Sequence, residues 1–234
     1  MEVLIIPDVH GRDFWKNPVN DLQYDKAIFL GDYVDHYEGE SNAAHDILIL
    51  EDIIKLKKSD PDKYILLLGN HDLPYIWPDS YGKALGSYWC RHNSFNHDEI
   101  HDLFVDNLDL FTFAWECDNM VYGKVLFTHA GVTNIYKDVC GLSALKINKF
   151  FKDKTGDIPN VVGLASVSHY RGGYQDTGSI VWADIREHIY NPVEEVFQIF
   201  GHTYSKKEII TANFAMLDTG KDCWMLTDKG LNKV

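Results

Sequence analysis

The sequence predicts an α/β protein, because short apolar segments of strand length alternate with a longer amphipathic segment. Residues 2–7, 26–30 and 64–68 are almost continuously apolar, and each run stops at proline, glycine or a charged side chain. Residues 41–58 carry apolar side chains at helical spacing behind Ser41, a plausible N-cap. Uninterrupted apolar strands that alternate with helices are typical of a parallel sheet covered on both faces. We therefore expect a βαβαβ-like beginning with right-handed crossovers.

The segment 73–110 does not fit this alternation. It is rich in Tyr, Trp, Asn, His and Asp, and Pro74, Pro78, Gly82 and Gly86 interrupt any long helix. Only the part from 96 to 107 has the composition of a short helix. We interpret 73–110 as a cap or insertion within a single domain spanning residues 1–234, although its aromatic residues fit equally well the packing of a small subdomain.

The rest of the chain predicts further strands with one helical segment. The expected elements are an antiparallel pair at 111–117 and 120–128 joined by Asp118-Asn119, a helical segment from 141 to 154, a short buried strand from 194 to 200, and antiparallel strands from 209 to 227. Together they would close the fold.

Composition limits the classes of partner. The chain has 22 Lys and Arg against 35 Asp and Glu, a formal net charge of −13, which argues against binding nucleic acid polymers or anionic membranes. No signal pattern and no apolar stretch of bilayer length is visible. The four cysteines are widely separated, as expected for reduced thiols in a cytoplasmic protein.

Polar side chains able to bind a metal or move a proton follow five of the apolar segments. They are Asp8 and His10, Asp32 and Asp35, Asn70 and His71, His129, and His202. One such segment alone is adequately explained as a surface turn, but five of them favour a shared crevice at the carboxyl ends of the strands. Oxygen and imidazole ligands suit Mn, Fe or Zn, and they argue against a structural zinc site, whose ligands are thiolates. Two metals about 3.5–4 Å apart need a bridging anion, which a carboxylate such as that of Asp32 can supply.

These motifs resemble those of a known family. The set Asp8-x-His10, Gly31-Asp32-x-x-Asp35, Gly69-Asn70-His71-Asp72, His129-Ala-Gly and Gly201-His202-Thr203 is similar to that of the calcineurin-like metallophosphoesterase superfamily. Within it, the closer resemblance is to PPP-type serine/threonine phosphatases and to phosphatases related to symmetrical diadenosine-tetraphosphate hydrolases. The motifs span residues 8–203. The resemblance implies a four-layer β-sandwich of mixed sheets flanked by helices.

The resemblance also implies roles for individual residues. Asp8 and His10 would hold one divalent metal, Asp32 would bridge to a second, and Asn70, His129 and His202 would complete that second site. Manganese is the first expectation, with iron or zinc as alternatives. A metal-bridging hydroxide would attack the phosphorus, and His71, oriented by Asp35, would protonate the leaving group.

The residue that grips the phosphate is less clearly indicated. The protein phosphatases have an arginine directly after the second Asp of the Gly-Asp motif, where this chain has His36. Arg186, shortly after Val-Trp-Ala-Asp, resembles the phosphate-contacting arginine of this branch. Arg12 and Arg171 are further candidates, for which a surface role is the favoured interpretation.

The expected function is hydrolysis of a phosphate monoester, on a phosphoprotein or a small molecule. A dinucleoside polyphosphate hydrolase is the alternative, and a non-catalytic scaffold that kept the fold is a third hypothesis, which the full set of ligands disfavours. The acidic charge disfavours a nuclease. The expected partner is the phosphorylated substrate, and the sequence leaves the oligomeric state open.

Overall fold

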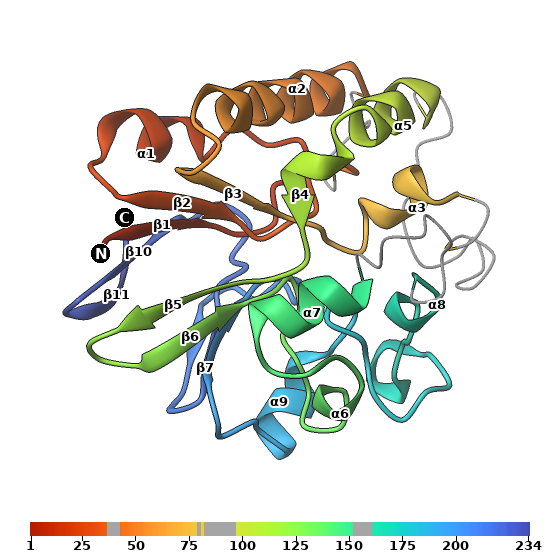
Figure 1. Cartoon of the computed structure of the whole chain (residues 1–234), viewed down its shortest axis with the longest axis vertical. Coiled ribbons are helices and arrows are strands. Elements are labelled where there is room, and N and C mark those ends of the chain that lie inside the picture. The colour runs from red at the N-terminus through yellow and green to blue at the C-terminus, as the bar shows by residue number, and fades with distance from the viewer. Residues whose placement is uncertain (37–42, 79–80, 82–96, 152–160) are drawn as a thin grey trace.

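The protein consists of two mixed β-sheets packed face to face, with helices on the outer face of each (Figure 1). The computed structural model describes residues 1–36, 43–78, 81, 97–151 and 161–234. This architecture confirms the expected α/β fold with mixed sheets flanked by helices.

The first sheet contains the strands at the beginning and the end of the chain. Its order is β11-β10-β1-β2-β3-β4. The strands are β1 (Val3–Ile6), β2 (Lys26–Phe29), β3 (Tyr64–Leu67), β4 (Phe111–Thr112), β10 (Trp224–Thr227) and β11 (Gly230–Lys233). Neighbours from β1 to β4 are parallel, whereas β10 and β11 pair antiparallel. The carboxyl ends of the four parallel strands therefore meet at one edge.

The second sheet has the order β5-β6-β7-β9-β8. Its strands are β5 (Trp115–Asn119), β6 (Gly123–Phe127), β7 (Phe197–Phe200), β8 (Ile209–Ile210) and β9 (Phe214–Met216). The central strands β6, β7 and β9 are parallel, and the outer strands pair antiparallel.

The two sides of β1 explain its uninterrupted apolar sequence. Val3 and Ile5 belong to the core between the two sheets, whereas Leu4 and Ile6 belong to the core beneath the outer helices. Successive side chains on a strand point to opposite faces, so a strand covered on both faces is apolar at every position.

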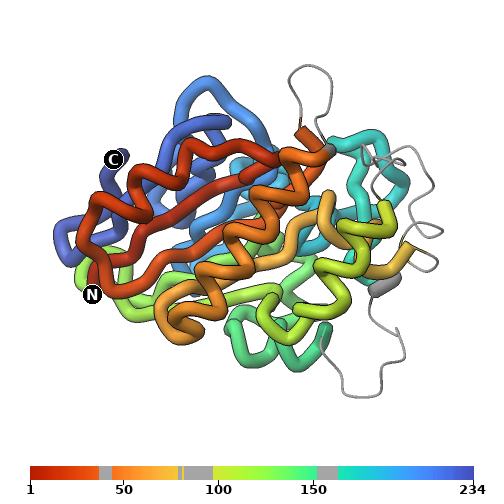
Figure 2. The backbone as a smooth tube through the Cα atoms, turned by 90° about the horizontal axis from the view of Figure 1, so that it is seen from above, coloured from red at the N-terminus to blue at the C-terminus, as the bar shows by residue number. Residues whose placement is uncertain are grey.

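Helices cover the outer faces of both sheets. They are α1 (Lys16–Asp21), α2 (Ala43–Ser59), α3 (Leu73–Ile76), α5 (His97–Val105), α6 (Lys137–Cys140), α7 (Ala144–Phe151), α8 (Val161–Leu164) and α9 (Ile185–Tyr190), with 3₁₀ turns at Leu108–Leu110 and His169–Arg171. The long α2 lies beside α5 over the first sheet (Figure 2). Among the described helices, none combines the length and the apolarity that crossing a bilayer requires.

Several sequence-based expectations need correction. The hairpin turn follows Asn119 instead of containing it: Asn119 pairs with Gly123, and its Oδ1 accepts the amides of Val121 and Tyr122. The segment 111–117 is split, because β4 joins the first sheet and β5 the second. The expected helix within 141–154 starts only at Ala144, after Gly141 with φ +82° has ended α6.

The expected antiparallel strands within 209–227 are divided between the sheets. Strand β9 is parallel to β7, and β10 crosses over to the first sheet. The short helix α1 between β1 and β2 was not expected. The described part of 73–110 forms the crossover from β3 to β4, and the remainder of that segment lies outside the described residues. The expected N-cap Ser41 also lies outside them.

Candidate metal centre

The candidate site lies where the loops after β1, β2, β3, β6 and β7 meet. Its polar side chains are almost completely removed from solvent, which is costly without compensating partners. Those at most 6% exposed are Asp8, His10, Asp32, Asp35, Asn70, His71 and His129. His202 is partly buried. The structure thus brings together all eight residues that the sequence proposes as metal ligands, as proton donor and as the carboxylate that orients the donor.

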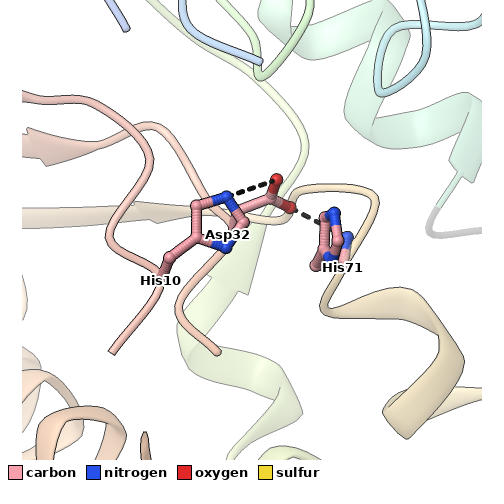
Figure 3. Close-up of side chains that lie close together, drawn as sticks. All are labelled: His10, Asp32 and His71. Atoms are coloured by element: carbon pink, nitrogen blue, oxygen red, sulfur yellow. Dashed lines mark hydrogen bonds and ion pairs between the residues drawn. The ribbon is translucent and has the colours of Figure 1, made fainter. Parts of the chain in front are cut away.

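Asp32 occupies the middle of the site (Figure 3). Its Oδ2 lies 3.6 Å from Nε2 of His10 and 3.4 Å from Nε2 of His129, and its Oδ1 accepts the backbone amide of His71 at 2.8 Å. Two groups of possible ligand atoms, each within 4.8 Å of one another, share this carboxylate. They are His10, Asp32 and His71, and Asp32, His129 and His202.

The second group contains a further oxygen donor. Nε2 of His129 is 3.0 Å from Oδ1 of Asn70 and 3.1 Å from Nδ1 of His202. Nε2 of His202 is buried and has no hydrogen-bond partner. A buried nitrogen without a partner, beside carboxylate and amide oxygens, is the donor chemistry that a divalent cation satisfies.

Backbone carbonyls fix the orientation of two histidines. Nδ1 of His10 lies 2.9 Å from the Val34 carbonyl oxygen, and Nδ1 of His129 lies 2.8 Å from that of Leu30. Because a carbonyl only accepts, each Nδ1 must carry a proton and donate it. In the neutral ring, Nε2 then keeps its lone pair facing Asp32, as a metal ligand requires.

Several ionisable groups of the site have strongly shifted pKa values. Burial raises the pKa of Asp8 to about 6 and lowers that of His10 to about 3. Burial also lowers the pKa of His129, but the carboxylates of Asp32 and Asp8 outweigh it and raise the value to about 9. A bound divalent cation would take the place of the proton on His129 and stabilise both carboxylates, so the residues present fit two metal ions.

Asp8 adjoins the two groups without belonging to either. Both of its carboxylate oxygens accept the amide of His202, at 2.9 and 3.0 Å. A side chain at Gly201 would collide with it, because a Cβ there would lie 2.1 Å from Asp8 Oδ1. Asp8 therefore links the end of β1 in the first sheet to the end of β7 in the second.

His71 is held by a second carboxylate. Its Nδ1 lies 2.8 Å from Oδ2 of Asp35, whose Oδ1 accepts the hydroxyl of Tyr75 at 2.6 Å. Burial lowers the pKa of His71, but Asp32 and Asp35 outweigh it and the net shift is upward. This arrangement favours a protonated imidazole beside the possible metal ligands His10 and Asp32.

The backbone of the site is unusual. Among the described residues other than glycine, positive φ occurs only at His10 (+46°), Asp32 (+52°), Asp35 (+68°) and His202 (+67°), and all four belong to the site. Such conformations cost free energy and persist where the surrounding structure enforces them, typically at functional sites. Gly69 serves the same centre, since a Cβ there would lie 2.2 Å from Asp32 Oδ1.

A cavity of about 840 Å³ opens from the centre. Its lining comes from the loops after β1, β2, β7 and β9 and from the turn at residue 171. The lining residues are His10, Arg12, Asp13, Phe14, His36, Arg171, His202, Tyr204, Asp218, Thr219, Gly220 and Lys221.

The phosphate-binding candidates divide into two groups. Arg12, His36 and Arg171 line the cavity, and Arg171 donates to Oγ1 of Thr203 at 2.7 Å. Arg186 is not among the lining residues. Its Nε donates to Asp184 at 2.6 Å, and its guanidinium lies 4.9 Å from the centre of the Tyr170 ring.

Two buried acids have roles that the sequence did not reveal. Asp72 accepts the amides of Asp32, Tyr33 and Gly69 at 2.8–3.0 Å and so joins the loops after β2 and β3. Asp46, on α2, accepts the amide of Asp35 at 3.3 Å. For Asp46, the available sequence signal was an aspartate at a core-facing position of an amphipathic helix, where a charge needs a partner.

Comparisons with known proteins agree with this site. Residues 1–206 match the model of the calcineurin-like phosphoesterase family, and the chain belongs to that family. Its structure is similar to that of a protein serine/threonine phosphatase from Saccharomyces cerevisiae with similarity to human phosphatase PP5. The TM-score is 0.57 at 13% sequence identity, over 100% of this chain and 79% of that chain, so this similarity concerns the fold. No curated protein matches the sequence.

Proposed function

We propose that the protein is a dinuclear metal-dependent phosphoesterase that hydrolyses phosphate monoesters. The observation that supports this most directly is the position of Asp32, whose carboxylate belongs to both groups of possible metal ligands at the inner end of a large cavity. Family membership supports the phosphoester class of substrate.

Asp32 would bridge the two ions, with His10 and Asp8 on one side and Asn70, His129 and His202 on the other. When bound, two divalent cations supply Lewis acidity, which makes a water nucleophilic near neutral pH and neutralises phosphate oxygens. Manganese is our first choice of metal. The protein holds the phosphate with Arg12, Arg171 and His36, which line the cavity.

His71 would provide the proton for the leaving oxygen. Asp35 holds Nδ1, which leaves Nε2 to carry and release the transferred proton. A positioned acid of this kind accelerates such reactions typically by 10²–10⁴-fold. Because the phosphorus is attacked from the side opposite the leaving group, the acid and the nucleophile must face the phosphate from opposite directions.

The geometry also allows a different role for His71, since it belongs to the first group of possible ligands together with His10 and Asp32. As a ligand it would be neutral, whereas the two carboxylates beside it favour the protonated ring. The hydrogen bond to Asp35 is compatible with both roles, so a measurement must separate them.

The test compares wild type with His71→Asn on p-nitrophenyl phosphate and on phenyl phosphate with Mn²⁺ added, together with the metal content of each. As an acid, His71 matters most for the poorer leaving group, so the variant should lose about 10²–10⁴-fold on phenyl phosphate and less on p-nitrophenyl phosphate, with unchanged metal content. Equal loss on both esters together with one missing metal would make His71 a ligand. A wild type inactive on both esters would reject the enzyme.

The alternative that the site supports is hydrolysis of a phosphoanhydride, as in a dinucleoside polyphosphate. The size of the cavity favours it, because about 840 Å³ is more than one phosphate group occupies. A non-catalytic scaffold is disfavoured because every proposed ligand and the proposed acid converge in one place.

A further inference from the structure

The loop that follows β6 carries His129, and neighbouring segments hold its main chain in place. The carbonyl oxygen of His129 accepts the amide of Gly201 at 2.8 Å. The amide of Ala130 donates to the carbonyl oxygen of Ile180 at 2.8 Å. The imidazole of His129 is fixed at Nδ1 by the carbonyl of Leu30, but the ring still moves with its own backbone. The direction of its Nε2 therefore depends on these main-chain contacts as well.

The next main-chain group in the loop, the carbonyl of Ala130, is bound by a buried histidine. This residue, His188, lies on α9, which covers the outer face of the second sheet (Figure 1). It is 1% exposed, and its Nε2 lies 3.0 Å from the Ala130 carbonyl oxygen. Because a carbonyl only accepts, Nε2 carries a proton and donates it. Burial lowers the pKa of His188 to about 4, so the ring is neutral near pH 7.

The space around His188 fits an imidazole closely. A Cβ on Gly131, whose φ is +84°, would lie 2.6 Å from Cε1 and 2.7 Å from Nε2 of His188. The rings of Phe200 and Phe214 pack against the imidazole, with centroids 4.5 Å and 5.8 Å away. An imidazole enclosed in this way cannot turn from the carbonyl without displacing buried rings. Since Phe200 ends β7 two residues before His202, His188 contacts the segments that lead to two proposed ligands.

Helix α9 also reaches a second part of the site. Asp184 is the N-cap of this helix, four residues before His188. Its Oδ2 lies 3.5 Å from Nε of Arg171, which lines the cavity. One short helix thus contacts both the loop of a proposed metal ligand and a proposed phosphate-binding arginine.

We propose that His188 is a positioning residue for the second metal site, because it holds the main chain at Ala130 so that Nε2 of His129 faces Asp32. This proposal rests on the proposed function and assigns an effect on the metal to a side chain that is not among the lining residues of the cavity. Without the donor, the carbonyl of Ala130 is left unsatisfied in a buried place, and the loop shifts to find a partner. The 3.4 Å approach of His129 to Asp32 is then lost.

The alternative is that His188 only completes the apolar cluster around Phe200 and Phe214. A residue that only fills space affects stability and leaves the affinity for metal unchanged. The affinity for each ion therefore distinguishes the two roles.

The test measures Mn²⁺ binding to the metal-free chain by titration calorimetry in wild type and three variants. His188→Leu removes the donor, His188→Asn carries an NH₂ group that is too short to reach the carbonyl, and His188→Gln keeps an NH₂ group near the place of Nε2. Partners outside the ligand set typically change metal affinity 10–100-fold, so one ion should bind about tenfold more weakly in the Leu and Asn variants. The other ion should bind as in wild type, and His188→Gln should retain most of the affinity for both. If His188→Leu does not fold, the Asn and Gln variants make the same comparison.

Two further measurements locate the effect. In a chain that already carries His129→Ala, adding His188→Asn should leave the affinity for the remaining ion unchanged, because both changes act on the same site. With p-nitrophenyl phosphate, the Mn²⁺ concentration for half-maximal activity should rise by the same factor as the dissociation constant, whereas kcat at saturating Mn²⁺ should return close to the wild-type value.

Asn107→Leu is the matched control. Nδ2 of the buried Asn107 donates to the carbonyl oxygen of Leu103 at 2.8 Å, so this variant also removes a buried donor from a main-chain carbonyl. It should lower the thermal unfolding temperature of the metal-free chain and leave Mn²⁺ binding unchanged. Wild-type affinity for both ions in a folded His188→Asn, or the same weakening in His188→Gln or in the control, would overturn the role of His188. A wild type that takes up no Mn²⁺ would instead reject the proposed function and this role together, so the two failures are distinguishable.

Discussion

At the scale of single residues, Asp35 connects His71, the proposed proton donor, to the fold. Its side chain holds Nδ1 of His71 and accepts the Tyr75 hydroxyl, while its backbone amide donates to the buried Asp46. Its own backbone is in the left-handed region, with φ +68°. Several contacts thus hold Asp35 in a conformation that a residue with a side chain rarely adopts.

Replacing Asp35 should shift the pH dependence of catalysis. Burial lowers the pKa of His71, whereas Asp32 and Asp35 raise it, so Asp35→Asn removes one of the upward influences while the amide oxygen still accepts from Nδ1. His71 must be protonated to act as the acid, and activity is lost as pH rises through its pKa. The alkaline limb of kcat should therefore move to lower pH in the variant.

The comparison uses pH profiles of kcat for phenyl phosphate at saturating Mn²⁺. Tyr75→Phe serves as a counterpart, because loss of its hydroxyl leaves Asp35 a better acceptor and should move the alkaline limb in the opposite direction. An alkaline limb at the same pH in wild type and Asp35→Asn would show that His71 is not the titrating acid.

The sequence predicted the residues of the centre because each follows a recognisable apolar strand. It did not reveal Asp46 or Asp72, whose partners are backbone amides supplied by other elements. It also ranked Arg186 above Arg171 on the basis of a neighbouring motif. Only the folded chain shows that Asp184 pairs with both arginines, at 2.6 Å for Arg186 and 3.5 Å for Arg171, and that Arg171 lines the cavity.

At the scale of elements, the strands that are buried on both faces could be predicted from the sequence. The neighbouring strands with which they pair could not. Strand β4 is two residues long, and nothing in 111–117 shows that the chain changes sheets within it. The hairpin turn was misplaced because Asn119 favours turns, and here it caps the turn from the preceding position. Assignment to a sheet depends on distant residues, which local patterns do not encode.

Glu187 organises the loop that carries Arg171. Its Oε1 accepts Ser168 Oγ at 2.7 Å and the Asp184 amide at 2.9 Å, and its Oε2 accepts Thr177 Oγ1 at 3.0 Å and the Gly178 amide at 2.9 Å. One carboxylate thereby closes the capping box of α9 and joins it to the preceding loop.

Glu187→Gln should therefore destabilise the loop. The NH₂ group of the glutamine side chain would face two of the four donors, which would lose their acceptor. This loss should lower the free energy of unfolding by about 1–3 kcal/mol. Activity should fall as Arg171 loses its position. Urea denaturation and phosphatase assays measure both effects, with Glu194→Gln, at an exposed position on the following loop, as the matched control. Stability equal to wild type would show that the carboxylate does not organise the loop.

At the scale of the whole molecule, the fold places the candidate metal centre between the two sheets, and its possible ligands come from both. Asp8, Asp32 and Asn70 follow strands of the first sheet, and His129 and His202 follow strands of the second. Ions bound there should hold the two sheets together, and mass action predicts greater stability when a metal binds only the folded state. The order of motifs in the sequence predicted this convergence, whereas the outer part of the cavity became visible only in the folded chain.

The most direct test of this account is the number of metal ions bound per chain, measured by elemental analysis after dialysis against Mn²⁺, in wild type and in Asp32→Asn. We expect two ions in wild type and at most one in the variant, because an amide cannot replace the shared carboxylate. Circular dichroism would verify that the variant is folded. Two ions in Asp32→Asn, or none in wild type, would contradict a centre built around Asp32.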